Sequence, residues 1–247
     1  MAEPLRLSFG RAAFDYEFGR PEWPEGIALV GGLPRSAHVL DLGAGTGKLT
    51  RVLARRFARV TAVEPDESMR AVCSHVTDDC LDGSGEAIPL PAASVDGVFC
   101  GDAFHWFDWA HALGEIARVL RPRGTLVLGF NGPTGETEPP WPDAASEVVS
   151  RYRRPGIEPG GPIIESGEWR EAFDGSPFEE LRKEEIGYEV VLDRDREVAC
   201  TLSVSIFAAL PDEERARFGE ELREVLPDVL FRTPFASEVW WTRLRAA

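Results

Sequence analysis

The segment Val39-Leu-Asp-Leu-Gly-Ala-Gly-Thr-Gly-Lys48 decides the fold, because a short apolar run passes directly into a turn with glycine at every second position. Glycine accepts positive φ angles and has no Cβ atom, so such a turn brings bare backbone close to a ligand. The residues that follow have a helical pattern, and the N–H groups at the start of that helix face the turn. The segment therefore predicts a strand, a nucleotide-binding turn and a helix.

The spacing of the glycines separates the possible cofactor classes. A dinucleotide site needs Gly-x-Gly-x-x-Gly, in which the third glycine comes one position later than Gly47. The sequence also has no Gly-x-x-x-x-Gly-Lys-Ser/Thr phosphate loop. The turn thus favours a nucleoside without phosphates, and a nicotinamide-dependent oxidoreductase stays open as an alternative.

A second apolar run, 60–63, ends at Glu64 and is followed by Pro65-Asp66, where a helix is expected to begin. A carboxylate at the end of a second parallel strand can accept hydrogen bonds from both hydroxyls of a ribose. We therefore predict that Glu64 holds the ribose of the nucleoside.

With these residues the chain resembles the class I S-adenosylmethionine-dependent methyltransferases, and among them the small-molecule group similar to trans-aconitate methyltransferase. The resemblance extends to about Phe130. It rests on five segments in the family's order: Val39–Thr50, Val63–Met69, Gly85–Leu90, Asp96–Asp108 and Leu120–Gly124. It implies S-adenosylmethionine as the cofactor and S-adenosylhomocysteine as the product.

The resemblance implies an α/β fold with a Rossmann-like, seven-stranded, mostly parallel sheet and helices on both of its faces. A single domain over 1–247 is expected, with a helical leader at 1–35, a cofactor-binding core at 36–131, and a cap with the C-terminal strands at 132–247 on the substrate side. The alternation of apolar runs and amphipathic segments agrees with this. It predicts strands near 37–42, 59–63, 78–82, 95–100, 124–130, 179–191 and 234–244, and helices near 46–57, 66–75, 108–120, 144–154, 194–208 and 212–225. A Gly/Pro-rich loop is predicted at 155–162.

The loops after the first four strands are expected to meet in one crevice. By resemblance the cofactor is expected to contact Tyr16, Arg20, Asp41, Gly43, Ala44, Gly45, Gly47, Glu64, Pro65, Met69, Gly85, Glu86, Ala87, Asp102 and Ala103. Asp41 would order the turn or reach the cofactor's ammonium group through water. Asp82 stays an alternative to Glu86. Tyr16 and Arg20 are candidates for the methionyl carboxylate or the substrate, or are surface residues of a packed helix.

His105 lies in the segment after the fourth strand, where the methyl group is expected. With a pKa near 6.5 in its unperturbed state, a histidine there could take a proton from a hydroxyl or orient the substrate. The alternative is that His105 only orders the loop or contacts the cofactor.

The composition of the chain excludes several classes of binding partner. The net charge of −15 disfavours nucleic acid, because phosphate backbones are held by Lys and Arg. No apolar stretch is long enough to span a bilayer and no signal peptide is recognisable, so a cytoplasmic protein without a membrane partner is expected. A bacterial source is also expected. The four cysteines have no zinc-ligand spacing, and no metal is predicted.

We therefore expect an enzyme, monomer or homodimer, that methylates a small molecule, most readily at a hydroxyl or carboxylate oxygen and in keeping with secondary metabolism. N- or C-methylation of a small molecule is an alternative. Methylation of RNA or of a protein side chain is disfavoured by the charge. From a different class, the chain could be an S-adenosylmethionine-binding protein without catalysis.

Overall fold

The computed structural model describes residues 12–154 and 166–246. The predicted loop at 155–162 and the beginning of the leader, 1–11, lie outside the described residues.

The first half of the chain alternates strands and helices as the pattern predicts. Its elements are α2 (Ala13–Gly19), η2 (Glu25–Gly32), β1 (His38–Leu42), α3 (Lys48–Ala54), β2 (Arg59–Val63), α4 (Glu67–Cys73), β3 (Cys80–Leu81), β4 (Val95–Gly101), η3 (Phe104–Trp106), α5 (Trp109–Val119) and β5 (Leu120–Pro133). The second half contains α6 (Asp143–Tyr152), η4 (Glu168–Phe173), β6 (Arg182–Leu192), α8 (Arg194–Leu202), α9 (Ser205–Ala208), α10 (Asp212–Val225) and β7 (Phe231–Arg243).

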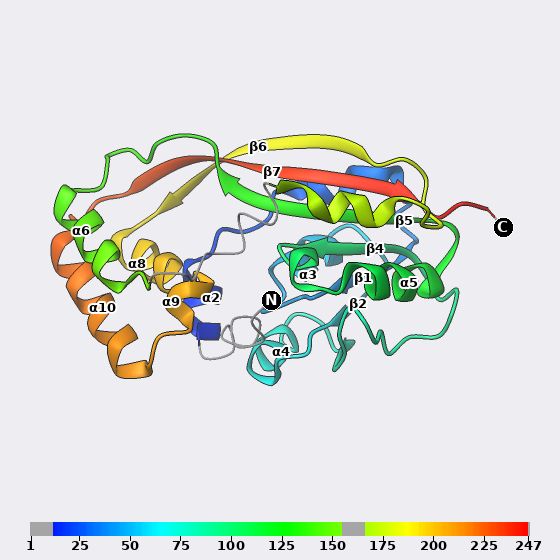
Figure 1. Cartoon of the computed structure of the whole chain (residues 1–247), viewed down its shortest axis with the longest axis horizontal. Coiled ribbons are helices and arrows are strands. Elements are labelled where there is room, and N and C mark those ends of the chain that lie inside the picture. The colour runs from blue at the N-terminus through cyan, green and yellow to red at the C-terminus, as the bar shows by residue number, and fades with distance from the viewer. Residues whose placement is uncertain (1–11, 155–165, 247) are drawn as a thin grey trace. The chain divides into compact units, whose positions relative to one another are not determined.

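Within the described residues, seven strands form one sheet in the order β3-β2-β1-β4-β5-β7-β6 (Figure 1). The pairs β1–β2, β1–β4, β2–β3 and β4–β5 are parallel. The arrow of β7 runs opposite to that of β5. The predicted Rossmann-like α/β class is confirmed. Because β1 and β4 are neighbours but not consecutive, the strand order reverses between them, and crevices for ligands open at the carboxyl ends of such strands.

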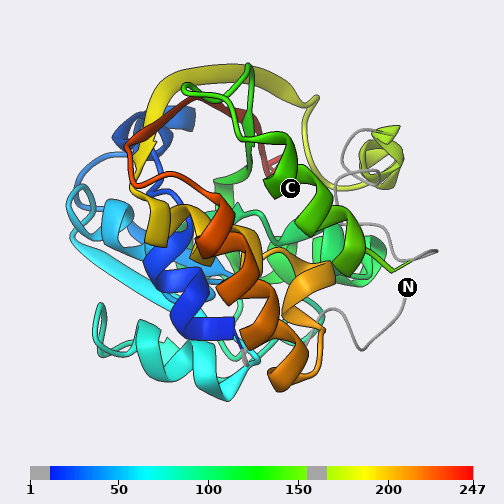
Figure 2. The same ribbon diagram turned by 90° about the vertical axis from the view of Figure 1, so that its left-hand side faces the viewer.

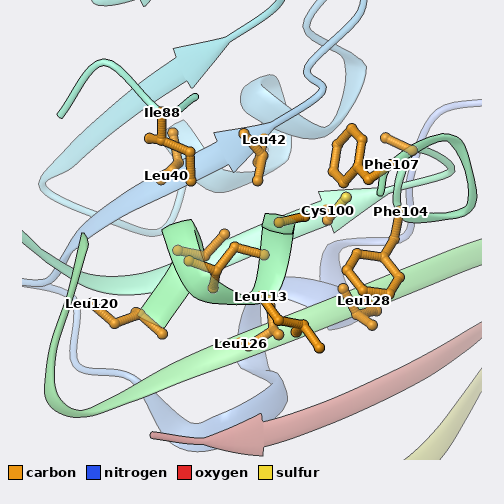
Figure 3. Packing of buried hydrophobic residues seen from close by; sticks show 14 of the residues in the cluster. Leu40, Leu42, Ile88, Cys100, Phe104, Phe107, Leu113, Leu120, Leu126 and Leu128 are labelled. Carbon is orange, nitrogen blue, oxygen red and sulfur yellow. The ribbon is translucent and has the colours of Figure 1, made fainter. Parts of the chain in front are cut away.

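The alternation of side chains along β1 explains why helices cover both faces of the sheet. Leu40 and Leu42 pack into a cluster with the buried residues of α5, which Figure 3 shows together with Leu126 and Leu128 of β5. Val39 points to the other face and packs in a cluster with residues of α3 and η2. Burial on both faces is the reason that the strands are nearly continuous apolar runs.

The chain forms two compact units. The first, here called the core unit, comprises Glu22–Asn131, Pro162–Ile186 and Ser237–Ala247. The second, the helical unit, comprises Met1–Pro21, Gly132–Gly161 and Gly187–Ala236. Its own apolar cluster joins α6, α8, α9 and α10, with Tyr152 stacked on Phe218 at 4.5 Å between ring centroids.

Two sequence predictions of elements are wrong in detail. The helix predicted at 194–208 is two helices, because Val204 adopts extended backbone angles between α8 and α9. The fifth strand begins at Leu120 and not at 124, since the chain pairs with β4 directly after α5. Asp108 caps α5, with its side chain accepting a hydrogen bond from the His111 backbone at 3.2 Å.

Candidate functional site

The glycine turn after β1 is anchored to β2 by its backbone. The N–H groups of Gly43 and Ala44 both donate to the carbonyl of Val63, at 2.9 and 3.1 Å. Gly43 and Gly45 have φ angles of 73° and 56°, in the left-handed region that favours glycine. A Cβ atom at Gly43 would lie 2.6 Å from the Cβ of Ala103, whereas at Gly45 it would meet nothing within 4 Å. Gly43 is therefore needed for packing, and Gly45 leaves its side of the turn open.

Glu64 lies at the end of β2 and is 8% exposed. One carboxylate oxygen accepts from the Gly45 N–H at 2.8 Å, and the other accepts from the Asp66 N–H at 3.0 Å. Burial raises the pKa of Glu64, and these two backbone donors oppose that rise. A carboxylate offers about four acceptor positions. Glu64 therefore ties the turn to the start of α4 and keeps further acceptor capacity.

Asp41, on β1, is buried and has one oxygen that is satisfied and one that is not. Its Oδ2 accepts from the hydroxyl of Thr50 at 2.6 Å, while Oδ1 has no hydrogen-bond partner among the described residues. Burial raises the pKa of Asp41 to about 7. An unpartnered buried oxygen is costly, so this position suits a positively charged or hydrogen-bond-donating ligand group. Sequence reasoning missed Thr50, because its role appears only when α3 folds back over β1.

Pro65 and Met69 lie at the start of α4. Asp66 caps this helix by accepting from the N–H groups of Ser68 and Met69, at 2.9 and 3.0 Å. The guanidinium of Arg70 donates to the carbonyls of Glu64 and Pro65, at 2.8 and 3.0 Å. Met69 is 2% exposed. The loop is thus rigidly held, and Met69 is part of the interior.

The loop that follows β3 carries Gly85, Glu86 and Ala87. A carboxylate oxygen of Glu86 accepts from the Asp108 N–H at 2.9 Å, which ties this loop to the segment after β4. A Cβ at Gly85 would lie 2.7 Å from the ring of Phe107, so the two loops are in close contact. The alternative acid, Asp82, is exposed and pairs with Arg70 at 3.2 Å.

The segment after β4 begins with Asp102 and Ala103. Asp102 has a φ of 49°, which is uncommon for a residue other than glycine. Its N–H donates to the carbonyl of Gly129 at 2.9 Å, and its carboxylate accepts from the N–H of Asn131 at 2.9 Å. Ala103 is buried and lies against Gly43. Asp102 therefore joins the end of β4 to the end of β5.

His105 is 6% exposed, within η3. Its Nδ1 is buried and has no hydrogen-bond partner in the described part of the chain. The imidazole lies 4.9 Å from the ring of Trp106 and 6.3 Å from that of Phe130, both measured between centroids. Burial lowers the pKa of His105 to about 4. The ring is therefore neutral at physiological pH, and its buried Nδ1 has no hydrogen-bond partner among the described residues.

Tyr16 and Arg20 belong to the helical unit. The Arg20 guanidinium lies 5.6 Å from the centre of the Tyr16 ring, and its Nε donates to the hydroxyl of Ser203 at 2.8 Å. Arg20 is thus part of the contact between α2 and the end of α8, and Tyr16 lies beside its guanidinium. Their role toward a cofactor stays a prediction.

The hydrogen bonds and close contacts join the loops that follow β1, β2 and β4, and the loop after β3 joins them through Glu86 and Gly85. Every predicted site residue of the core unit lies on one of these loops or on the adjoining strand and helix. Together they combine an open backbone turn, a carboxylate with spare acceptor capacity, a buried acid with one unpartnered oxygen among the described residues, and a neutral histidine.

A family model described as a methyltransferase domain matches residues 40–128. An uncharacterized methyltransferase-like protein of Schizosaccharomyces pombe is 36% identical over 91% of this chain and 88% of its own length. An uncharacterized methyltransferase of Mycobacterium bovis is 35% identical over 90% and 86%. The malonyl-[acyl-carrier protein] O-methyltransferase of Pectobacterium atrosepticum is 32% identical over 56% and 58%.

A solved structure from Anaeromyxobacter dehalogenans, provisionally a type II methyltransferase, covers 92% of this chain and 99% of its own, with a TM-score of 0.63 and 22% identity. That likeness supports the fold. None of the described helices combines the length and apolar character that crossing a membrane requires.

Proposed function

The chain belongs to the class I S-adenosylmethionine-dependent methyltransferases, and from this we propose that its core unit binds S-adenosylmethionine at the loops after β1 to β4 and methylates a small molecule at an oxygen. The observation that carries the proposal is the link between Gly45 and Glu64. It places an open backbone turn and a buried carboxylate next to each other at the carboxyl ends of β1 and β2.

The residues of the loops fit the three polar parts of this cofactor. Gly45 leaves room for the amino-acid part to approach the backbone. The unpartnered Oδ1 of Asp41 suits the ammonium group, which would supply the missing donor. Glu64 suits the ribose hydroxyls, because each of its oxygens can accept another hydrogen bond.

When bound, the cofactor supplies a methyl group that its positive sulfur already activates. What the protein must contribute is mainly the alignment of the acceptor atom and the exclusion of water. The loop after β4 is suited to this, because Asp102 fixes its start and Phe104 and His105 are buried within it.

His105 fits the role of a neutral hydrogen-bond acceptor for a hydroxyl substrate. With its pKa near 4, the ring is uncharged in the resting enzyme at neutral pH, so one of its two nitrogens can accept a hydrogen bond. It can orient the hydroxyl and take the proton as the bond to the methyl group forms. A carboxylate acceptor would carry no proton and would need no such help.

Two further observations support a small oxygen acceptor. The partial similarity to a malonyl-[acyl-carrier protein] O-methyltransferase, over 56% of this chain, favours oxygen over nitrogen or carbon. The net charge of −15 disfavours a nucleic-acid acceptor.

Calorimetric titration with S-adenosylmethionine, S-adenosylhomocysteine and NAD in parallel tests the cofactor. We expect both adenosyl ligands to bind and NAD not to bind; binding of NAD alone would contradict the proposal. Incubation with S-adenosylmethionine carrying a labelled methyl group and a panel of phenols, carboxylic acids and amines then tests the acceptor. Label on amines only would exclude an oxygen acceptor, and binding without turnover on any class would indicate a non-catalytic protein.

A further inference from the structure

Helix α2 is held firmly within the helical unit. A Cβ atom at Gly19 would lie 2.1 Å from the backbone of α8, so the two helices are in direct contact there. Arg20 donates to Ser203 at 2.8 Å, and Asp15 pairs with Arg215 of α10 at 3.1 Å. Figure 2 shows α2 alongside α8 and α10. These contacts determine which face of α2 is left uncovered within this unit.

That uncovered face carries two aromatic rings. Phe14 and Phe18 are four residues apart, and therefore neighbours on one side of the helix. They are 77% and 41% exposed. Their rings are stacked, with centroids 5.9 Å apart and planes inclined by 13°. Two adjacent, largely exposed phenyl rings are a costly arrangement in water and indicate a binding surface.

The rings line a shallow surface depression of about 360 Å³, which is open to solvent and is also lined by Glu17 and Arg196. This volume lies within the range of small-molecule sites. The Nε of Arg196 donates to the Phe18 carbonyl at 3.1 Å, which holds the guanidinium beside the rings. Its two terminal amino groups have no acceptor in the part of the chain that the structure describes.

We infer that this depression binds a small monocarboxylate with a flat apolar body. The flat body stacks on the phenyl rings, and the terminal amino groups of Arg196 pair with the carboxylate, whose geometry matches the planar guanidinium. Glu17 also lines the site. The site is argued from the helical unit alone and does not depend on the proposed methyl transfer.

Titration of the full-length protein with trans-cinnamate and with its neutral amide, cinnamamide, tests the site. The two probes have the same flat body and differ in charge. We expect cinnamate to bind about tenfold more tightly than cinnamamide, because a charge-assisted hydrogen bond replaces a neutral one. Arg196→Gln should abolish this difference. Arg223→Gln is the matched control, since Arg223 also lies in the helical unit but pairs with Asp195 outside the depression.

Two variants test the phenyl rings. We expect Phe14→Ser to weaken the binding of both probes by a similar factor, and Phe14→Leu to weaken it less. The exposure of Phe14 makes loss of folding by either variant improbable on physical grounds, and circular dichroism checks this. Equal binding of acid and amide to the wild type, or equal effects of Arg196→Gln and Arg223→Gln, would overturn the inference. So would a dimer that Phe14→Ser dissociates, together with no binding of cinnamate.

The carboxylate could be a methyl acceptor or an effector, and labelled S-adenosylmethionine distinguishes the two. Label in methyl cinnamate that Arg196→Gln removes would identify the bound carboxylate as a methyl acceptor. Cinnamate binding that Arg196→Gln weakens, without label transfer, would identify an effector site, and either result supports the inference. Because cinnamate binding is measured without S-adenosylmethionine, its failure is separable from a failure of the proposed function.

Discussion

The backbone N–H of Gly45 donates a hydrogen bond to the Glu64 carboxylate at 2.8 Å. This bond joins the glycine turn after β1 to the end of β2, two segments that the parallel pairing of their strands already places side by side. A residue that we predicted as a ribose ligand therefore also orders the turn in the protein without ligand. Because the turn is already ordered, less conformational entropy is lost when a nucleoside binds.

Glu64→Ala should weaken the binding of S-adenosylmethionine by about 1–3 kcal/mol, because it removes a charged acceptor from the ribose and releases the turn. Glu64→Gln should have an intermediate effect, since its amide keeps one acceptor oxygen. Calorimetric titration gives the dissociation constants. Glu67→Gln, which changes an exposed acid on the first turn of α4, is the control. An affinity of Glu64→Ala equal to that of this control would remove Glu64 from the site.

Local patterns predicted the part of the fold that local rules govern. The glycine turn and the alternation of strands and helices follow from residue types and spacings that act over a few positions. The sequence does not show that Thr50 donates to Asp41, because this contact needs α3 to be seated on β1. The break at Val204 is equally invisible, since the apolar period continues through α8 and α9.

The sequence also does not show the charge states of buried ionisable groups. The predicted role of His105 as a base or substrate orienter assumed an ordinary pKa. Burial among Phe104, Trp106 and Phe130 lowers this pKa, so the ring stays uncharged down to a pH of about 4. The sequence likewise does not distinguish Arg196 from the other arginines, because its position beside Phe14 and Phe18 depends on the packing of α2 against α8. Desolvation depends on the tertiary surroundings, which residue spacing does not record.

Gly45→Val should abolish binding of S-adenosylmethionine while the protein still folds. The added side chain meets no protein atom near its Cβ, so it would occupy the space of the ligand. Its positive φ adds a local cost of about 1–2 kcal/mol. Gly114→Ala is the control, because Gly114 lies in α5 with open space around it and alanine there should stabilise the helix by about 0.5–1 kcal/mol. Binding retained by Gly45→Val would mean that the turn does not face the ligand.

Asp41 should make the stability of the protein fall as pH rises from about 4 to about 7. Its pKa is about 7 in the folded state and about 3.9 in an unfolded chain, so the folded state binds the additional proton in this range. Stability from this group is complete below the unfolded value and is lost through the folded value. Thermal unfolding of the wild type and Asp41→Asn across this range isolates the effect. Parallel curves for the two proteins would contradict it.

The loss of the Asp41 proton should also make S-adenosylmethionine bind more tightly as pH rises toward 7. An ammonium group beside Asp41 favours the carboxylate, so binding releases a proton below that pH. Titrations in buffers of different ionisation enthalpy measure the released proton directly. Asp41→Asn should release none. Proton release that is unchanged in this variant would assign it to another group.

His105→Asn should lower turnover of hydroxyl acceptors by about ten- to hundredfold and leave the affinity for S-adenosylmethionine nearly unchanged, since the ring aids proton transfer rather than cofactor binding. Carboxylate acceptors, which carry no proton at neutral pH, should lose much less. His111→Asn is the matched control, because His111 is exposed on α5 and pairs with Asp108.

His105→Asn should also change the pH dependence of stability, which can be measured without a substrate. The pKa of His105 is about 4 in the folded protein and about 6.5 in an unfolded chain, so the unfolded state binds the additional proton between these values. The wild type should therefore lose stability through this group as pH falls from about 6.5 to about 4, and His105→Asn should lose less. Equal turnover with the altered acid sensitivity would show that His105 is buried as described but orders the loop without aiding proton transfer.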